Sequence, residues 1–118
     1  MYDFNYQRAT TVADASAKIK ASDDGMLMAG GMTLIPTLKQ RLAQPADVID
    51  LGGISDLVGI SVDGDVVTIG AMTTHATVAA SAEVKGKIPA LAELADGIGD
   101  PQVRNRGTIG GSIANNDP

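Results

Sequence analysis

Glycine is the residue that most restricts how this chain of 118 residues can fold, because nine of its 14 glycines gather in short clusters. One cluster, Gly30-Gly31, ends a short apolar run, and another, Gly107-Thr-Ile-Gly-Gly-Ser112, lies near the C-terminus. Glycine adopts positive φ angles and lets the backbone approach another group closely. Each cluster therefore predicts either a tight turn or a place where the backbone contacts a ligand.

The composition is typical of a globular chain, with 44% hydrophobic and 19% charged residues. The absence of cysteine excludes disulfides, iron–sulfur ligation and thiolate zinc within this chain, and the single histidine excludes a multi-histidine metal site. A net charge of −5 argues against a nucleic-acid partner. No apolar run approaches the roughly 20 residues of a membrane span. The N-terminus shows no signal-peptide pattern, so we expect a cytoplasmic protein.

Hydrophobic periodicity predicts that strands and helices alternate in the first half of the chain. We expect strands at residues 3–6, 26–29 and 47–51, and helices at residues 10–21 and 33–42. The strand at residues 26–29 is uninterruptedly apolar and is predicted to be buried. Thr11 and Thr33 are the expected N-caps of the two helices.

The second half of the chain opens on a different pattern. Two β-rich runs flank Asp63-Gly64, which predicts a hairpin over residues 57–70. Short helices are expected at the end of residues 71–80 and at residues 88–95, and residues 96–107 read as irregular. The break at Gly52-Gly53 predicts two small α+β lobes, residues 1–53 and residues 54–118.

The segment Ala29-Gly-Gly-Met-Thr33 combines the end of a strand, two glycines and the start of a helix. Such an arrangement presents free backbone N–H groups to an anion. It matches neither the G-x-G-x-x-G nor the P-loop pattern. The alternative is a strand-to-helix turn that needs glycine only for its shape.

The segment from Gly107 to Ser112 has three glycines and two hydroxyl side chains, Thr108 and Ser112. It predicts a phosphate-binding loop, with an ordinary glycine-rich turn as the alternative. The presence of two such segments in one chain favours a site that binds a pyrophosphate from both sides.

Three further side chains are candidates for ligand contacts. Arg104 and Arg106 precede the second segment, and they could contact a phosphate or form an exposed pair in a loop. His75 could hydrogen-bond a ligand, but we favour a structural role for it.

Together, residues 29–39 and 103–118 resemble the FAD-binding (medium) subunits of molybdenum hydroxylases. The resemblance is greatest to the carbon monoxide dehydrogenase medium-subunit group, with the xanthine dehydrogenase FAD subunits nearby. Phe4-x-Tyr6 and Gly70-Ala-Met-Thr-Thr-His75 fit the same pattern, so the resemblance covers the whole chain. It implies an α+β, vanillyl-alcohol-oxidase-type (PCMH-type) FAD-binding fold.

The resemblance also implies the residues that bind FAD, with the pyrophosphate between the two lobes. The first binding segment would be Ala29, Gly30, Gly31, Met32 and Thr33, and the second would be Thr108, Ile109, Gly110, Gly111 and Ser112. No catalytic side chain and no metal ligand is implied in this chain.

In function, the resemblance implies a subunit whose FAD takes electrons from a small 2Fe-2S subunit and passes them to an external acceptor. A large subunit would carry the molybdenum cofactor. Subunits of that family are more than twice as long, so we expect an N-terminal fragment that is inactive alone. A stand-alone flavin oxidase of the same fold and a scaffold lobe without a nucleotide stay open as alternatives. The substrate also stays open among carbon monoxide, a purine, an aldehyde and an N-heterocycle.

Overall fold

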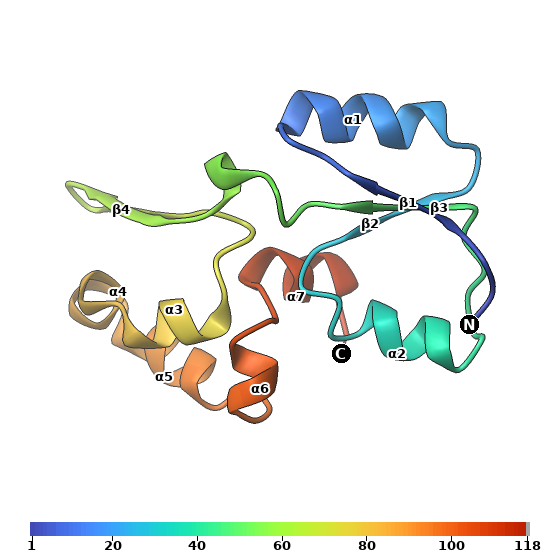
Figure 1. Ribbon diagram of the computed structural model, residues 1–118. Coiled ribbons are helices and arrows are strands. Elements are labelled where there is room, and N and C mark those ends of the chain that lie inside the picture. The colour runs from blue at the N-terminus through green and yellow to red at the C-terminus, as the bar shows by residue number, and fades with distance from the viewer. Residues whose placement is uncertain (118) are drawn as a thin grey trace. The chain divides into compact units, whose positions relative to one another are not determined.

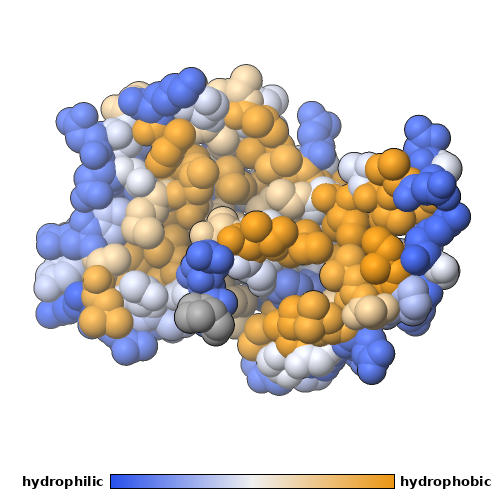
Figure 2. All heavy atoms as spheres, turned by 180° about the vertical axis from the view of Figure 1, so that it is seen from behind, coloured by the Kyte–Doolittle hydropathy of each residue, from blue (hydrophilic) through white to orange (hydrophobic). Residues whose placement is uncertain are grey.

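The structure is a computed structural model that describes residues 1–117. The chain divides into two compact units, Met1–Asp56 and a second unit that starts at Leu57, with a short 3₁₀ helix, η1 (Ser55–Leu57), at the division (Figure 1). Some apolar side chains lie on the surface of the protein (Figure 2). No helix among residues 1–117 is long and apolar enough to cross a membrane.

The first unit is built on a parallel three-stranded sheet. Its strands are β1 (Asn5–Arg8), β2 (Gly25–Met28) and β3 (Asp47–Asp50), in the order β1-β3-β2. Helices α1 (Val12–Ala21) and α2 (Leu34–Lys39) connect them. The first crossover leads from β1 past β3 to β2, and the second leads back from β2 to β3. Because both crossovers have the usual right-handed sense, the two helices lie on opposite faces of the sheet (Figure 1).

The central strand β3 forms the core of this unit. Its neighbouring residues Val48 and Ile49 point to opposite faces, and both are buried, which requires cover on both sides of the sheet. Ala15 of α1 and Leu38 of α2 are the buried side chains of the two covering helices.

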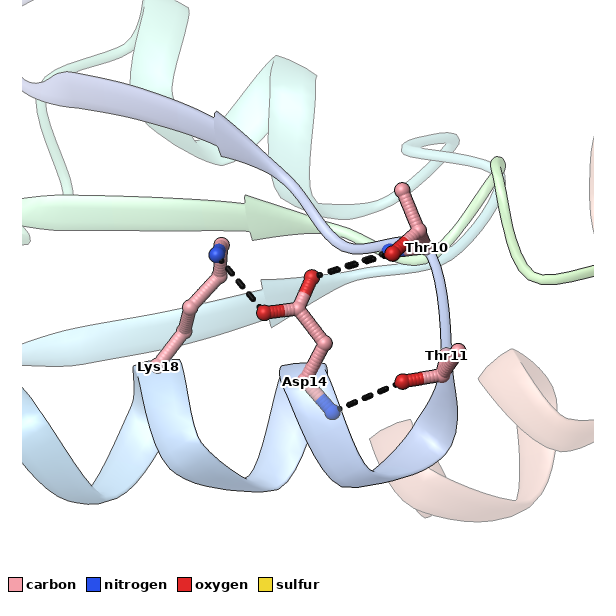
Figure 3. Close-up of polar contacts among 4 residues, drawn as sticks. All are labelled: Thr10, Thr11, Asp14 and Lys18. Carbon is pink, nitrogen blue, oxygen red and sulfur yellow. Dashed lines mark hydrogen bonds and ion pairs between the residues drawn. The ribbon is translucent and has the colours of Figure 1, made fainter.

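The start of α1 is fixed by side chains, as predicted (Figure 3). Thr11 is the N-cap, and its hydroxyl accepts a hydrogen bond from the Asp14 N–H at 3.0 Å. The Asp14 carboxylate pairs with Lys18 at 2.8 Å and accepts from the Thr10 N–H at 3.0 Å. Both contacts lower the pKa of Asp14, and the contact with Lys18 has the larger effect. They stabilise the carboxylate at the positive end of the helix.

Two expectations in this unit are wrong. Strand β2 is not buried: Met26 and Leu27 are 38% and 47% exposed, because β2 is an edge strand. Thr33 does not cap α2 with its side chain, because its own backbone is already helical rather than extended. The helix stops at Lys39, since Arg41 adopts a left-handed conformation with φ of 57°.

The second unit begins with the predicted hairpin. Strands β4 (Ile60–Asp63) and β5 (Val66–Ile69) pair antiparallel, and Asp63 lies opposite Val66. The turn residues are therefore Gly64 and Asp65, one position later than expected. Gly64 has φ of +58°, which a glycine adopts without strain.

Five short helices follow the hairpin. They are α3 (His75–Ala80), α4 (Ala82–Lys87), α5 (Pro89–Asp96), α6 (Pro101–Arg104) and α7 (Ile109–Asn115). The core of the unit is aliphatic, with Val78, Val84, Ala92 and Ala95 buried together. Side chains of the hairpin, including Ile60 and Val67, pack against this core.

Helices α4, α6 and α7 were not predicted, and the expectation of irregular structure at residues 96–107 is wrong. Each of these helices has a polar N-cap, namely Ser81, Asp100 and Thr108. In each case the side-chain oxygen accepts a hydrogen bond from the N–H three residues later. The caps explain how such short helices can begin in glycine-rich sequence.

Candidate functional site

The first candidate segment, residues 29–33, forms the turn between β2 and α2. Gly31 has φ of +79°, and an added Cβ would lie 2.7 Å from the Ile35 Cδ1 atom. The Gly31 carbonyl accepts the Ile35 N–H at 2.9 Å, which joins the turn to the helix. Met32 and Thr33 are exposed. The backbone conformation of this turn therefore requires glycine at position 31.

The backbone N–H groups of this turn are unpaired. Within residues 1–117, those from Gly30 to Thr33 donate to no protein acceptor, and α2 has no side-chain cap that would engage them. Successive unpaired N–H groups beside a left-handed glycine are a suitable donor set for an oxyanion such as a phosphate. The turn thus presents free backbone N–H groups, the arrangement that the sequence pattern predicted for binding an anion.

The second candidate segment is not a loop. Thr108 is the N-cap of α7, and Ile109, Gly110, Gly111 and Ser112 form its first turn. Their N–H groups are all engaged: the one of Ile109 bonds to the Thr73 carbonyl at 3.1 Å and that of Gly110 to the Ala71 carbonyl at 2.9 Å.

The remaining two N–H groups of this turn bond to Thr108. That of Gly111 donates to the Thr108 hydroxyl at 3.0 Å, and that of Ser112 donates to the Thr108 carbonyl at 3.1 Å. Residues 109–112 therefore have no free backbone N–H group that could donate to a phosphate. Among residues 109–112, the exposed side chain of Ser112 remains available to a ligand.

Gly110 is required here by packing. An added Cβ would lie 2.6 Å from the carbonyl oxygen of Ala71 and 2.9 Å from its Cα. Those are backbone atoms that cannot rotate away, so only glycine allows α7 to approach this closely.

Residues 71–75 form the surface against which the start of α7 is held. Thr73 is fully buried, and its hydroxyl donates to the Gly59 carbonyl at 3.2 Å and accepts the Gly59 N–H at 3.0 Å. Thr74 and Thr108 form an isolated antiparallel bridge. The backbone of His75 continues it by donating its N–H to the Gly107 carbonyl at 3.0 Å. The segment thus joins the hairpin to α7.

The imidazole of His75 is buried, with 5% of the residue exposed. Its Nε2 atom lies 3.1 Å from the hydroxyl oxygen of Ser112. Burial disfavours the imidazolium form and lowers the pKa of His75. The preference for a structural role is consistent with this contact, and the contact also links His75 to a predicted site residue.

Arg104 has a structural role. Its Nη1 donates to the carbonyls of Ile98 and Gly99 at 3.2 Å and 3.0 Å, which holds the loop before α6. Arg106 is exposed. Among the residues that the structure describes, no group of three or more His, Asp or Glu side chains could hold a metal ion.

The fold is that of a FAD-binding domain of the PCMH type. Residues 2–118 match the family described as the FAD binding domain in molybdopterin dehydrogenase, and the chain belongs to that family. This confirms the resemblance found in the sequence and the fold that it implied.

Individual relatives agree with this assignment. The carbon monoxide dehydrogenase medium chain of Afipia carboxidovorans is 47% identical over 116 residues, which are 98% of this chain and 40% of that protein. The solved carbon monoxide dehydrogenase of Hydrogenophaga pseudoflava that lacks the Mo-pyranopterin moiety superposes with a TM-score of 0.96 at 46% identity, over 99% of this chain and 41% of that one. For quinoline 2-oxidoreductase of Pseudomonas putida 86 the TM-score is 0.92 at 32% identity, over 96% and 40% of the two chains. The chain thus spans about 40% of the length of these relatives.

Proposed function

We propose that this chain provides the FAD-binding residues of the medium subunit of a carbon monoxide dehydrogenase-like molybdenum hydroxylase. The observation that carries the proposal is the row of unpaired N–H groups from Gly30 to Thr33 in a chain of this family. FAD would supply the redox chemistry, which none of this chain's side chains provides. The contribution of the protein is to bind and orient the cofactor.

The two candidate segments would contact the pyrophosphate in different ways. In the first, Ala29, Gly30, Gly31, Met32 and Thr33, backbone N–H groups would donate to phosphate oxygens. In the second, Thr108, Ile109, Gly110, Gly111 and Ser112, the backbone forms a rigid helical turn and the Ser112 hydroxyl would be the donor. Hydrogen bonds to charged groups contribute about 1.5–3 kcal/mol each.

The proposed partners are a large subunit that carries the molybdenum cofactor and a small 2Fe-2S subunit. The FAD would receive electrons from the 2Fe-2S subunit and pass them to an external acceptor. A chain without cysteine cannot itself hold the iron–sulfur clusters.

The proposal is tested by titrating FAD into the 118-residue chain and following the heat of binding and the quenching of flavin fluorescence. We expect saturable binding with a dissociation constant of roughly micromolar or weaker. Gly31→Ala should weaken binding, because it distorts the turn that presents the N–H groups. Gly86→Ala is the matched control, since an added Cβ there lies in open space.

The outcome separates the proposed function from its alternatives. No binding at about 1 mM FAD, which lies at the weak end of the affinity scale, would favour a scaffold without a nucleotide. Flavin reduction by a small alcohol without any partner subunit would favour a stand-alone oxidase.

A further inference from the structure

The start of α7 has two hydroxyl side chains in different situations. Thr108 is buried, at 3% exposure, and its hydroxyl already accepts the Gly111 N–H. Ser112 is exposed, and its hydroxyl oxygen lies 3.1 Å from Nε2 of His75. With the N–H groups of residues 109–112 engaged, the Ser112 hydroxyl is the group of this turn that can bond to a ligand.

We propose that His75 is a positioning residue that orients the Ser112 hydroxyl to donate its proton to a phosphate oxygen of the dinucleotide. The proposal rests on the proposed function, because it assumes that Ser112 contacts the FAD pyrophosphate. It adds a residue from outside both glycine segments, and it states which atom of that residue carries the proton.

The count of donors and acceptors leads to this assignment. A serine hydroxyl has one proton to donate and lone pairs that accept, whereas a phosphate oxygen without a proton only accepts. If Ser112 donates to the phosphate, it cannot also donate to His75. The Nε2 atom must then carry a hydrogen and donate it to the Ser112 oxygen.

The surroundings of His75 are suited to this role. The Gly107 carbonyl accepts its backbone N–H, and an added Cβ on Gly107 would lie 3.1 Å from the ring Cδ2 atom, so the ring is held closely on that side. Within residues 1–117, every buried side-chain nitrogen or oxygen has a hydrogen-bond partner. The Nδ1 atom of His75 is therefore not left as a buried acceptor without a partner when it carries no hydrogen. The lowered pKa of His75 also favours a neutral ring at neutral pH.

The first test reads the tautomer directly. His75 is the only histidine, so long-range ¹H–¹⁵N NMR of the imidazole is free of overlap. The spectrum is recorded on the 118-residue chain at neutral pH, alone, with FAD, and with ADP as a probe that carries the diphosphate without the flavin. We expect the protonated nitrogen to be Nε2 in both complexes. A ring protonated at Nδ1 in the complexes would overturn the proposal, since Ser112 would then donate to His75.

The second test uses variants and the affinity for FAD. Ser112→Ala and His75→Phe should each weaken binding about tenfold, the effect of one lost hydrogen bond to a charged group. The double variant should be weakened by about the same tenfold, because both changes remove one function. His75→Gln, which keeps an amide N–H near the Nε2 position, should bind within about threefold of the parent chain.

The outcomes distinguish this inference from the function on which it rests. Loss of about a hundredfold in the double variant, or full affinity in Ser112→Ala, would overturn the role of His75 while FAD binding itself stands. If neither FAD nor ADP binds the parent chain, both the proposed function and this inference are wrong. Because Ser112 is exposed, Ser112→Ala should fold normally, so that variant and the NMR experiment decide the question even if His75→Phe does not fold.

Discussion

Residues 29–33 and residues 108–112 both combine glycine with threonine, yet their backbones offer different groups to a ligand. In the first segment, the N–H groups from Gly30 to Thr33 are unpaired among the described residues. In the second, the N–H groups from Ile109 to Ser112 all bond within the protein. Similar glycine patterns thus lead to an open turn in one unit and a capped helix in the other.

The glycines themselves also have different purposes. Gly31 is needed for its positive φ of +79°. Gly110 lies in a helix and is needed because the Ala71 backbone is too close for any side chain. Conformation requires glycine in the first case and packing requires it in the second, and substitutions can separate the two.

The largest expected effect is that of Gly110→Ala. Its Cβ would lie 2.6 Å from the Ala71 carbonyl oxygen, so α7 must move away from residues 71–75. We expect the free energy of unfolding, measured by urea titration with circular dichroism, to fall by about 1–3 kcal/mol. Gly86→Ala, in a helix with open space around it, should instead raise stability by about 0.5–1 kcal/mol. Equal effects of the two substitutions would contradict the packing argument.

Gly31→Ala should have the next largest effect. A left-handed backbone costs an alanine about 1–2 kcal/mol, and the new Cβ also meets the flexible end of Ile35. Adding Ile35→Val removes the Cδ1 atom and should repair only the part due to this contact. If thermal unfolding shows complete repair, conformation is not the reason for the glycine.

Thr108, whose hydroxyl caps α7, and Thr33, whose hydroxyl makes no cap bond to α2, provide a matched pair of smaller effects. Thr108→Ala removes the hydroxyl that accepts the Gly111 N–H at 3.0 Å, and should lower the free energy of unfolding by about 1 kcal/mol. Thr33→Ala removes no cap bond and should change it by less than about 0.5 kcal/mol. A reversed order in urea titrations would contradict the assignment of the caps.

The smallest expected effect is on the pH dependence of stability. Because burial lowers the pKa of His75 in the folded chain below its value of 6.5, the unfolded chain binds the proton more readily. Stability should therefore decline as the pH falls below about 6.5 and stay level above it. Unfolding titrations between pH 7.5 and 5 should show this decline, and His75→Gln should remove it. A slope that is unchanged in the variant would assign the effect to other groups.

Much of the fold could be predicted from local patterns. The alternation of strands and helices in the first unit, the Thr11 cap and the hairpin all depend on residues close in sequence, and the structure has them with small shifts in their bounds. The exposure of Leu27 could not be read from an apolar run, because the position of a strand in its sheet depends on distant pairing. The helices α4, α6 and α7 were missed because α6 spans only four residues and because α4 and α7 contain glycines, which are unfavourable in a helix.

The candidate site shows the same limit. The glycine pattern located both segments but not their conformations, because glycine tolerates a turn and a close helix contact equally well. Only the structure shows that Ala71 lies against Gly110. The contact between His75 and Ser112 joins residues 37 positions apart, so no local spacing reveals it.

The division of the chain into two units has a spectroscopic consequence. The three aromatic residues, Tyr2, Phe4 and Tyr6, all belong to the first unit, and the one imidazole belongs to the second. Tyrosine emission, undisturbed because the chain has no tryptophan, therefore reports on the first unit alone. The imidazole NMR signals report on the second. One denaturant series followed by both signals would measure whether the units unfold at the same concentration, with ¹⁵N as the only label.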